Sequence, residues 1–207
     1  MHWSPNSSLI ALVANGDTSG DLSSFQTIVA VDGGLVALDR RGISPHLITG
    51  DFDSVPLELL EKYKHIPQLH TPDQEHSDLE KAIDFLLRFQ PEKLMVFGAL
   101  GKRADHLIAN ILLLSRYPEK LVYESSMETL YVINNKSLIK TTPGQTLSLI
   151  PLNGPVSGIT TRGLKWELAN ATLDKHFVGL SNVSLNEEIY ITHESGDLLL
   201  CLNKRLV

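Results

Sequence analysis

Two carboxylates lie one residue apart in the segment GDFDS, residues 50–54, directly after an apolar run at residues 47–49. This pattern places Asp51 and Asp53 just beyond the end of a buried strand. Carboxylates that converge repel each other strongly unless a cation lies among them, and oxygen ligands suit Mg²⁺. The pair therefore indicates a divalent metal site.

Polar side chains also follow the other predicted strands of the first half. Ligands of an open α/β sheet bind beyond the carboxyl ends of its strands, so we expect these side chains at one edge of the sheet. They are Asn15, Asp32, Asp51, Asp53, Asp78, Arg103, Asp105 and His106. The candidates for metal ligation are Asp51, Asp53, Asp78 and Asp105. Any single aspartate here also fits a helix cap or a turn, and only the whole set favours the metal.

The segment GALGKRADH, residues 98–106, adds positive groups to the same edge. Its glycines let the backbone approach a ligand closely, and the helix that follows points free N–H groups at an anion, which suits phosphate. Arg103, His106 and Asn110 share one stripe of that helix, although Arg103 and His106 also fit a solvated face. The residues expected to face the core are Leu107, Ile108, Ile111 and Leu112. Neither a P-loop nor a dinucleotide-binding pattern is present.

Short apolar runs alternate with helical patterns in the first half of the chain. The runs predict buried strands within residues 7–16, 27–34, 45–54, 65–73 and 93–101. Helices are expected within residues 76–89 and 103–117, and a third is expected to have Pro56 in its first turn. This alternation predicts right-handed crossovers and a mostly parallel sheet with helices on both faces.

From about residue 126 onward the helical periodicity disappears. Antiparallel strands are expected within residues 129–135, 136–145, 146–154, 156–163, 164–170, 176–182, 187–195 and 196–203. Turn residues at 143–144, 153–154 and 195–196 favour a sandwich or a barrel. We therefore predict an α/β domain over residues 1–125 and a smaller all-β sandwich domain over residues 126–207.

Trp166 is the most informative aromatic residue of the second half. In the segment GLKWEL, residues 163–168, the residues Leu164, Trp166 and Leu168 alternate with Lys165 and Glu167. The alternation favours a core position for the indole. The same ring also suits stacking on a flat cationic ring, and the sequence pattern does not separate the two interpretations.

Composition excludes several classes of function. A net charge of −6, without a cluster of basic residues, argues against a nucleic-acid partner. The single cysteine, Cys201, excludes an intrachain disulfide and suits a reducing compartment. No signal-peptide pattern or membrane-length apolar run is present, so we expect a cytoplasmic protein with no membrane partner.

Five segments occur in an order that resembles the thiamine pyrophosphokinase family: GDFDS, SDLEKAI, GALGKRADH, GLKWEL and GLSN. The preceding VDGGL resembles the family's glycine turn on the nucleotide side. The resemblance covers nearly the whole chain. It implies an α/β nucleotide-binding domain, a β-sandwich and a homodimer. The implied reaction is the transfer of diphosphate from ATP to the hydroxyethyl group of thiamine, giving thiamine diphosphate and AMP.

Carried over by position, the resemblance implies that Asp51, Asp53 and Asp78 hold Mg²⁺ on the ATP phosphates. Asp105 is expected to support the metal or the substrate hydroxyl, and Arg103 to neutralise phosphate charge. The residues expected on the ATP side are Asp32, Gly33, Lys81, Gly101, Arg103, His106 and Asn110. On the thiamine side, Trp166 is expected to stack against the substrate, and Ser181 and Asn182 to line its pocket.

The sequence departs from the family pattern at two positions. Val183 follows Asn182 where many members have an acidic residue, and Lys102 occupies a position that is often glycine. Two other functions fit part of the sequence. One is a nucleotide-sugar glycosyltransferase that uses a DxD metal site, which leaves residues 98–106 and the β domain unexplained. The other is a non-catalytic thiamine-binding module, which the intact carboxylate set argues against, because uncompensated charges are costly to retain.

Overall fold

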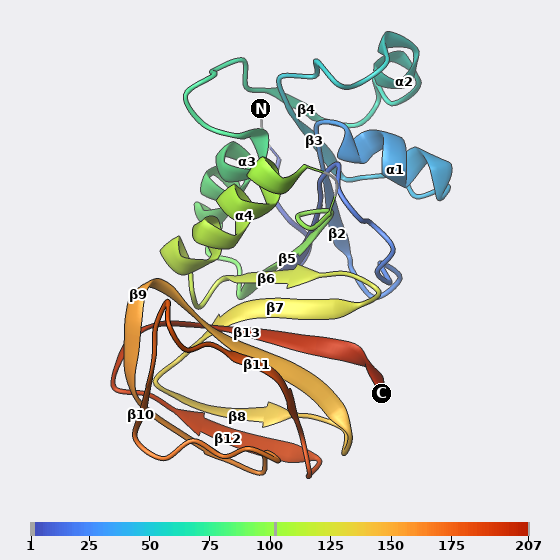
Figure 1. Cartoon of the computed structure of the whole chain (residues 1–207). Helices are drawn as coiled ribbons and strands as arrows, with labels where there is room; N and C mark the ends of the chain where they lie inside the picture. The colour runs from blue at the N-terminus through green and yellow to red at the C-terminus, as the bar shows by residue number, and fades with distance from the viewer. Residues whose placement is uncertain (1–2, 102, 207) are drawn as a thin grey trace. The chain divides into compact units, whose positions relative to one another are not determined.

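The computed structural model describes residues 3–101 and 103–206, and its contacts divide the chain into two compact units (Figure 1). The first unit contains the chain up to Asn110 together with Lys120–Ser125. The second contains Ile111–Glu119 and the chain from Ser126 onward. One helix therefore contributes to both units. The domain boundary between residues 125 and 126, which stays a prediction, assigns that helix to the first.

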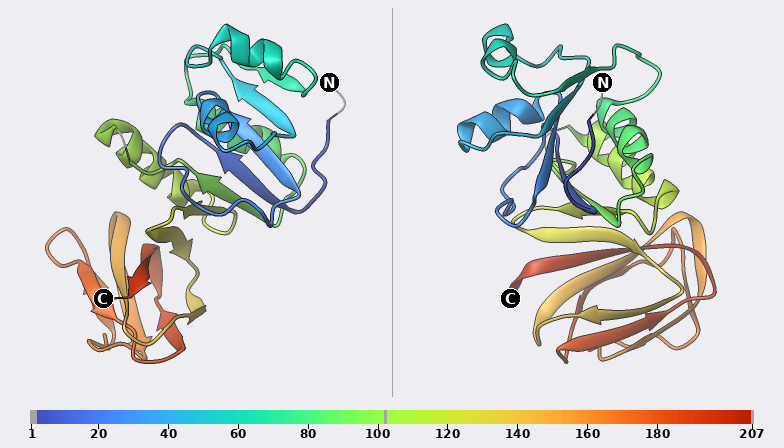
Figure 2. Two further views of the ribbon diagram at one scale, coloured as in Figure 1. Left: turned by 90° about the vertical axis from the view of Figure 1, so that its right-hand side faces the viewer. Right: turned by 180° about the vertical axis from the view of Figure 1, so that it is seen from behind.

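A parallel sheet in the order β4-β3-β2-β1-β5-β6 forms the centre of the first unit. Its strands are β1 (Leu9–Val13), β2 (Thr27–Val31), β3 (Leu47–Gly50), β4 (Gln68–His70), β5 (Lys93–Phe97) and β6 (Leu121–Glu124). Its helices are α1 (Gly34–Arg40), α2 (Leu57–Lys62), α3 (Asp78–Leu87) and α4 (Ala104–Arg116). Figures 1 and 2 show α1 and α3 on opposite faces of the sheet. The predicted parallel α/β architecture is confirmed.

Helix α3 forms where the sequence has both a cap and an apolar stripe. The Ser77 hydroxyl accepts a hydrogen bond from the Glu80 backbone N–H, which satisfies a free donor at the start of the helix. The stripe is buried at Leu79, Ala82, Ile83 and Leu86. Asp78 is the first residue of α3, so its carboxylate sits at the carboxyl-end edge of the sheet.

Three expectations about the other helices need correction. Pro56 does not lie in the first turn of α2 but precedes it as the N-cap residue. Helix α1 was not predicted, because it begins at Gly34, the second residue of a glycine pair that indicates a turn. In α4, Ile108 is 60% exposed and Leu112 is 48% exposed, so these two residues do not face the core. None of the helices in the described residues has the length and apolar character needed to cross a bilayer.

The second unit is built from antiparallel strands in the order β7-β13-β9-β12-β8, with β10 and β11 also paired to β9. The strands are β7 (Glu128–Ile133), β8 (Lys136–Lys140), β9 (Gln145–Arg162), β10 (Ala171–Leu173), β11 (Gly179–Val183), β12 (Glu188–Thr192) and β13 (Ser195–Leu206). Alternate residues of these strands form one buried apolar cluster that includes Leu149, Ile159 and Leu198. The predicted β-rich second domain is confirmed.

Two predicted features of the second unit are wrong. Residues 153–154 do not separate two strands, because β9 continues through them with positive φ angles of 56° at Asn153 and 129° at Gly154. The strand pairs with β13 up to this kink and again at Ser157, and with β12 near its end. Residues 164–170 are not a strand, and within them Leu164 forms an isolated bridge with Ser184. The segment is therefore a loop, and its apolar alternation does not define two faces.

Candidate active site

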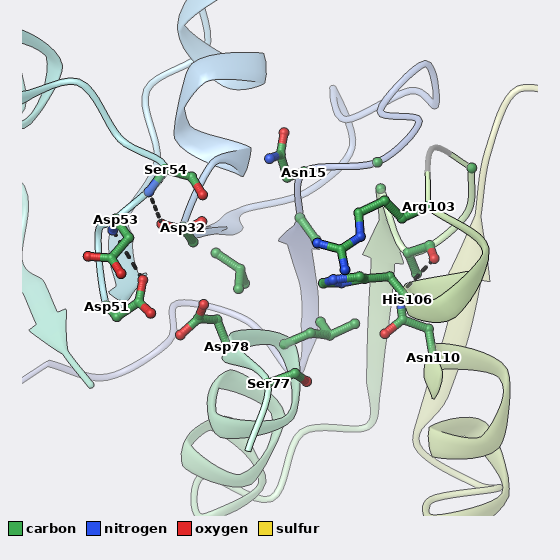
Figure 3. Close-up of a pocket in the computed structure, with 17 residues that line it drawn as sticks. Asn15, Asp32, Asp51, Asp53, Ser54, Ser77, Asp78, Arg103, His106 and Asn110 are labelled. Atoms are coloured by element: carbon green, nitrogen blue, oxygen red, sulfur yellow. Dashed lines mark hydrogen bonds between the residues drawn. The ribbon is translucent and has the colours of Figure 1, made fainter. Parts of the chain in front are cut away.

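A pocket of about 330 Å³ lies at the carboxyl ends of the parallel strands, and all its lining residues belong to the first unit. Figure 3 shows polar side chains pointing into it from several elements. Asp32 follows β2, Asp51 follows β3, and Asp78 begins α3. The volume of the pocket is typical of a site for a small molecule. We call it the carboxylate pocket.

Three carboxylates form the acidic side of this pocket. One oxygen each of Asp32, Asp51 and Asp78 lies within 4.8 Å of the other two, and all three residues are partly buried. Asp53 also lines the pocket but is exposed and lies outside this group. Like charges at this separation repel in a partly desolvated site, so the arrangement favours a bound cation.

The backbone is strained where it brings these carboxylates together. Asp32 has a φ of 44° and Phe52, between the two aspartates of GDFDS, has a φ of 69°. Such angles are uncommon for residues other than glycine and persist where surrounding contacts hold them. The Phe52 ring stacks on His70 with centroids 5.3 Å apart, which supplies one such contact. At Gly50, with φ 143°, a side chain would come within 3.0 Å of Asp32 Cβ, so glycine is required.

Asp51 is held by donors on both of its oxygens. The Asp53 backbone N–H donates to Asp51 Oδ1 at 3.1 Å, and Gln74 Nε2 donates to Oδ2 at 3.2 Å. The backbone hydrogen bond is the main cause that lowers the pKa of Asp51 below its ordinary value, against the opposing effect of burial. Asp51 therefore stays ionised at neutral pH and keeps a fixed orientation.

Lys81 holds the third carboxylate. Its Nζ lies 2.9 Å from Asp78 Oδ1, and it also donates to the backbone oxygens of Thr71 and Asp73. Lys81 was predicted on the ATP side, but the residues that line the carboxylate pocket in the described part of the chain do not include it. Its ammonium contacts protein oxygens.

Cationic and amide side chains lie across the pocket from Asp51 and Asp53 (Figure 3). Arg103 forms a two-point pair with Asp105, at 3.1 Å from Nε and 2.6 Å from Nη2. This pair lowers the pKa of Asp105 to about 2. Asn110 donates to the Ala99 carbonyl at 2.8 Å, so its amide also fixes the turn after β5.

Two loops that line the pocket meet through Gly16, which was not predicted, and Gly98, whose segment was expected to approach a ligand closely. Gly16 N donates to Gly98 O at 2.9 Å, and a side chain at Gly16 would lie 2.2 Å from that oxygen. A side chain at Gly98 would lie 2.3 Å from Ala14 O. These glycines serve close backbone packing. Gly16 lies three residues after the end of β1, and Gly98 directly follows β5.

Most of the residues predicted on the metal and ATP side line the carboxylate pocket: Asp32, Asp51, Asp53, Asp78, Gly101, Arg103, His106 and Asn110. Among the described residues the lining does not include Gly33, Lys81 or Asp105. Lys102 lies outside the described residues. Asn15, which was expected at this edge without an assigned role, also lines the pocket, as do Ser54 and Ser77, which were not predicted. Serines beside strand ends and helix starts carried no distinguishing signal, since they also serve as caps.

The loop of residues 163–170, here called the Trp166 loop, presents an aromatic ring in the second unit. Trp166 is 54% exposed, so the core interpretation of its position is wrong. The side chain of Asn182 holds the loop, since its Nδ2 donates to Trp166 O at 2.7 Å and its Oδ1 accepts from Trp166 N at 3.2 Å. Lys165 Nζ lies 4.6 Å from the indole centroid. A cation thus already contacts this ring.

Asn182 and Ser181 differ in what they offer to a ligand. Asn182 is buried, 9% exposed, and both ends of its amide bind backbone groups. Ser181 is exposed, has a φ of 54°, and donates its backbone N–H to Ser148 Oγ. Val183 follows in β11 and its N–H donates to Asn182 Oδ1 at 2.8 Å. Ser181 is therefore the hydroxyl that faces outward, and Asn182 fixes the loop.

A pocket at the carboxyl ends of a parallel α/β sheet, in a chain that continues into a β unit, is the architecture of an enzyme acting on small molecules. Residues 21–124 match the family described as "Thiamin pyrophosphokinase, catalytic domain", and residues 133–198 match "Thiamin pyrophosphokinase, vitamin B1 binding domain". The chain belongs to the thiamin pyrophosphokinase family, whose members are enzymes, and the resemblance drawn from the sequence is confirmed.

Individual relatives agree with this membership. The chain is 32% identical to "Thiamine pyrophosphokinase 2" of Arabidopsis thaliana over 77% of its own length and 66% of that protein. It therefore spans about two thirds of that plant relative. It is 29% identical to the thiamine pyrophosphokinase of Bacillus subtilis over 78% of this chain and 82% of that protein. The crystal structure of a thiamine pyrophosphokinase from Bacillus subtilis matches the fold with a TM-score of 0.87, at 24% identity, over 96% of this chain and all of that one.

Proposed function

We propose that this chain is a thiamine diphosphokinase, which transfers a diphosphate group from ATP to the hydroxyl of thiamine. The observation that carries the proposal is the convergence of Asp32, Asp51 and Asp78 in the pocket of a chain whose two parts both match this family. The comparisons do not support the glycosyltransferase or the non-catalytic binding module. The products are thiamine diphosphate and AMP.

The reaction makes one bond and breaks one. The thiamine hydroxyl oxygen attacks the β-phosphorus of ATP, the bond from that phosphorus to the oxygen bridging it to the α-phosphorus breaks, and AMP leaves with that oxygen. An alcohol is a weak nucleophile and ATP is a polyanion, so the step depends on in-line positioning and charge neutralisation. The carboxylate pocket supports both requirements, with anionic groups on one side and Arg103 on the other.

The three clustered carboxylates fit Mg²⁺, because they present hard oxygen donors within 4.8 Å of one another. We assign Asp51 and Asp78 as ligands, with Asp32 and Asp53 as the two candidates for a further carboxylate. When bound, Mg²⁺ supplies charge neutralisation on the phosphate oxygens. Asp51 is prepared for this role by its lowered pKa and its two donors.

Arg103 and Asp105 divide their roles on the opposite side of the pocket. Arg103 lines the pocket and is positioned to contact phosphate oxygens, with Asp105 fixing its guanidinium. Because the pKa of Asp105 is about 2, this carboxylate is a poor acceptor for the proton of the thiamine hydroxyl. Asp78 is the other candidate for receiving this proton, but it is paired with Lys81 and assigned to the metal, so an Asp78 variant has to be compared for metal binding as well as for turnover.

We assign thiamine binding to the surface around Trp166. The exposed indole stacks on a flat cationic ring, as the thiazolium of thiamine is, and the neighbouring contact with Lys165 supports this preference. Ser181 supplies an outward hydroxyl in the same unit. A homodimer and a cytoplasmic location remain predictions from the sequence. Light scattering on the purified protein tests the first.

The test of this function is incubation of the purified protein with ATP, Mg²⁺ and thiamine, followed by chromatography of the products. We expect AMP and thiamine diphosphate in equal amounts, and loss of both in Asp51→Ala, which removes one of the three clustered carboxylates. Asp84→Ala is the matched control, because Asp84 is an exposed aspartate on α3 that does not line the pocket. ADP with thiamine monophosphate would overturn attack at the β-phosphorus. Saturable thiamine binding without products would favour the binding module.

A further inference from the structure

Lys81 has a largely buried side chain at the start of α3. Its side chain is only 11% exposed. The ammonium contacts Thr71 O at 2.6 Å, Asp73 O at 2.7 Å and Asp78 Oδ1 at 2.9 Å. Two of its three N–H donors are satisfied by the carbonyls of Thr71 and Asp73, whereas the contact with Asp78 is an ion pair. Asp78 Oδ1 is buried and has no hydrogen-bond partner among the described residues, so the nearby Lys81 charge is what balances it.

The two carbonyls that Lys81 binds belong to the loop between β4 and α3. Thr71 and Asp73 flank Pro72, which has no N–H of its own to anchor this stretch. The loop also reaches the carboxylate pocket at two other points. The Thr71 N–H donates to Gly50 O at 2.8 Å, directly before Asp51.

The second point is Gln74, whose Nε2 donates to Asp51 Oδ2 at 3.2 Å. One buried cation thus connects to two carboxylates. It contacts Asp78 directly, and it fixes the backbone of Asp73, the neighbour of the glutamine that orients Asp51. The lysine is three residues from Asp78 on α3, which places both side chains on one face of the helix.

We propose that Lys81 is a positioning residue of the carboxylate pocket, which holds Asp78 directly and Asp51 through the 71–77 loop. This rests on the proposed function, in which these carboxylates hold a divalent cation. Two effects of Lys81 on that cation oppose each other. Its positive charge repels a divalent ion, so charge alone would make Lys81→Met bind metal more tightly. If Lys81 positions the carboxylates, the same variant instead binds metal more weakly. The sign of the change in metal affinity therefore shows whether the positioning or the charge of Lys81 has the larger effect.

The test measures Mn²⁺ binding to the full chain by electron paramagnetic resonance of the free ion, without nucleotide. We expect the dissociation constant to rise about tenfold in Lys81→Met, as a misplaced ligand costs in metal sites. Lys81→Arg keeps the charge, but a planar guanidinium cannot reproduce the contacts that one ammonium makes with Thr71, Asp73 and Asp78, so its dissociation constant for Mn²⁺ is expected to be intermediate. Lys62→Met is the matched control, since Lys62 also forms an ion pair, with Asp39, but lies outside the pocket. Its Mn²⁺ affinity is expected to equal that of the unmodified chain.

A second measurement separates this inference from the proposed function. Hydrogen exchange of the peptide that contains residues 71–77 is expected to be faster in Lys81→Met and unchanged in Lys62→Met. If the unmodified chain binds no Mn²⁺ but exchange of the 71–77 peptide is still faster in Lys81→Met, the assignment of the metal site is wrong. The inference that Lys81 holds the loop would then still be supported. Equal or tighter Mn²⁺ binding in Lys81→Met, or unchanged exchange, overturns the positioning role. In turnover assays the Mg²⁺ activation constant is expected to rise while the KM for thiamine stays within about twofold.

Discussion

The carboxylate pocket and the Trp166 loop place their functional groups by opposite means. In the pocket, like charges are gathered by strained backbone at Asp32 and Phe52 and held by donors on each side. In the loop, one neutral aromatic ring is exposed, and a single buried amide, that of Asn182, fixes its backbone. In the pocket, the strained backbone costs stability, and the gathered carboxylates form a site that favours a cation. The loop leaves the ring free of the core, so its loss should change binding more than folding.

The largest expected effect comes from removing one clustered charge. Asp51→Asn is expected to lower the rate of diphosphate transfer about a thousandfold, because several kcal/mol of charge stabilisation depend on the bound cation. The melting temperature is expected to fall slightly, since the lowered pKa of Asp51 means that its ionised form stabilises the folded chain, and Gln74 loses its acceptor if the Asn amide nitrogen takes the place of Oδ2. Product assays and calorimetry measure the two quantities. A variant that keeps more than a tenth of the rate would break the proposed role of the pocket.

The next effect concerns the exposed ring. Trp166→Ala is expected to raise the KM for thiamine about tenfold or more, because a cation–π contact contributes about 1 to 2 kcal/mol. The melting temperature is expected to change little, as the ring is 54% exposed. Phe177→Ala is the control, since Phe177 is 53% exposed in the same unit. An equal rise in both variants would show that the apolar surface in general, and not the indole, binds the substrate.

Asn182 is expected to affect both stability and binding. Asn182→Ala leaves backbone groups of Trp166 without their partner, which costs about 1 to 3 kcal/mol of unfolding free energy. The KM for thiamine is expected to rise by about threefold, less than in Trp166→Ala, because the ring is still present. Asn182→Asp keeps the acceptor and loses the donor, so its unfolding free energy should lie between those of the unmodified chain and Asn182→Ala. Denaturant unfolding and steady-state kinetics provide the measurements. Normal stability with a raised KM would instead favour direct contact between Asn182 and thiamine.

The smallest effect is the pH response of Asp105. Its pKa in the folded chain is lowered to about 2 by Arg103, so the ion pair contributes stability above the ordinary aspartate pKa and loses it as pH falls toward 2. No change from this group is expected at neutral pH. Carbon-13 NMR of the Asp105 carboxyl is expected to show a pKa near about 4 in Arg103→Gln. If Asp105 titrated near neutral pH in the unmodified chain, its pairing with Arg103 would be wrong. Asp105 would then again be a candidate for accepting the proton of the thiamine hydroxyl.

Much of the acidic edge was predictable from the sequence because a parallel sheet has a simple rule. Each strand end delivers the residues that follow it to one edge, so Asp32, Asp51 and Asp78 were expected together before any coordinates. The cap and apolar stripe of α3 were equally local, since Ser77 and the helical spacing are both read from neighbours in the chain. These features depend on spacing of a few residues, which a sequence records directly.

The remaining assignments depend on partners far away in the chain, and only the tertiary structure decided them. Trp166 alternates like a core residue, but Asn182 and the bridge at Leu164 turn its segment into a loop that exposes the ring. Lys81 resembles a phosphate contact until its ammonium is seen to bind Thr71 and Asp73. Periodicity tells which side chains share a face. It does not tell which distant backbone group will satisfy a buried donor, because that depends on how the elements pack.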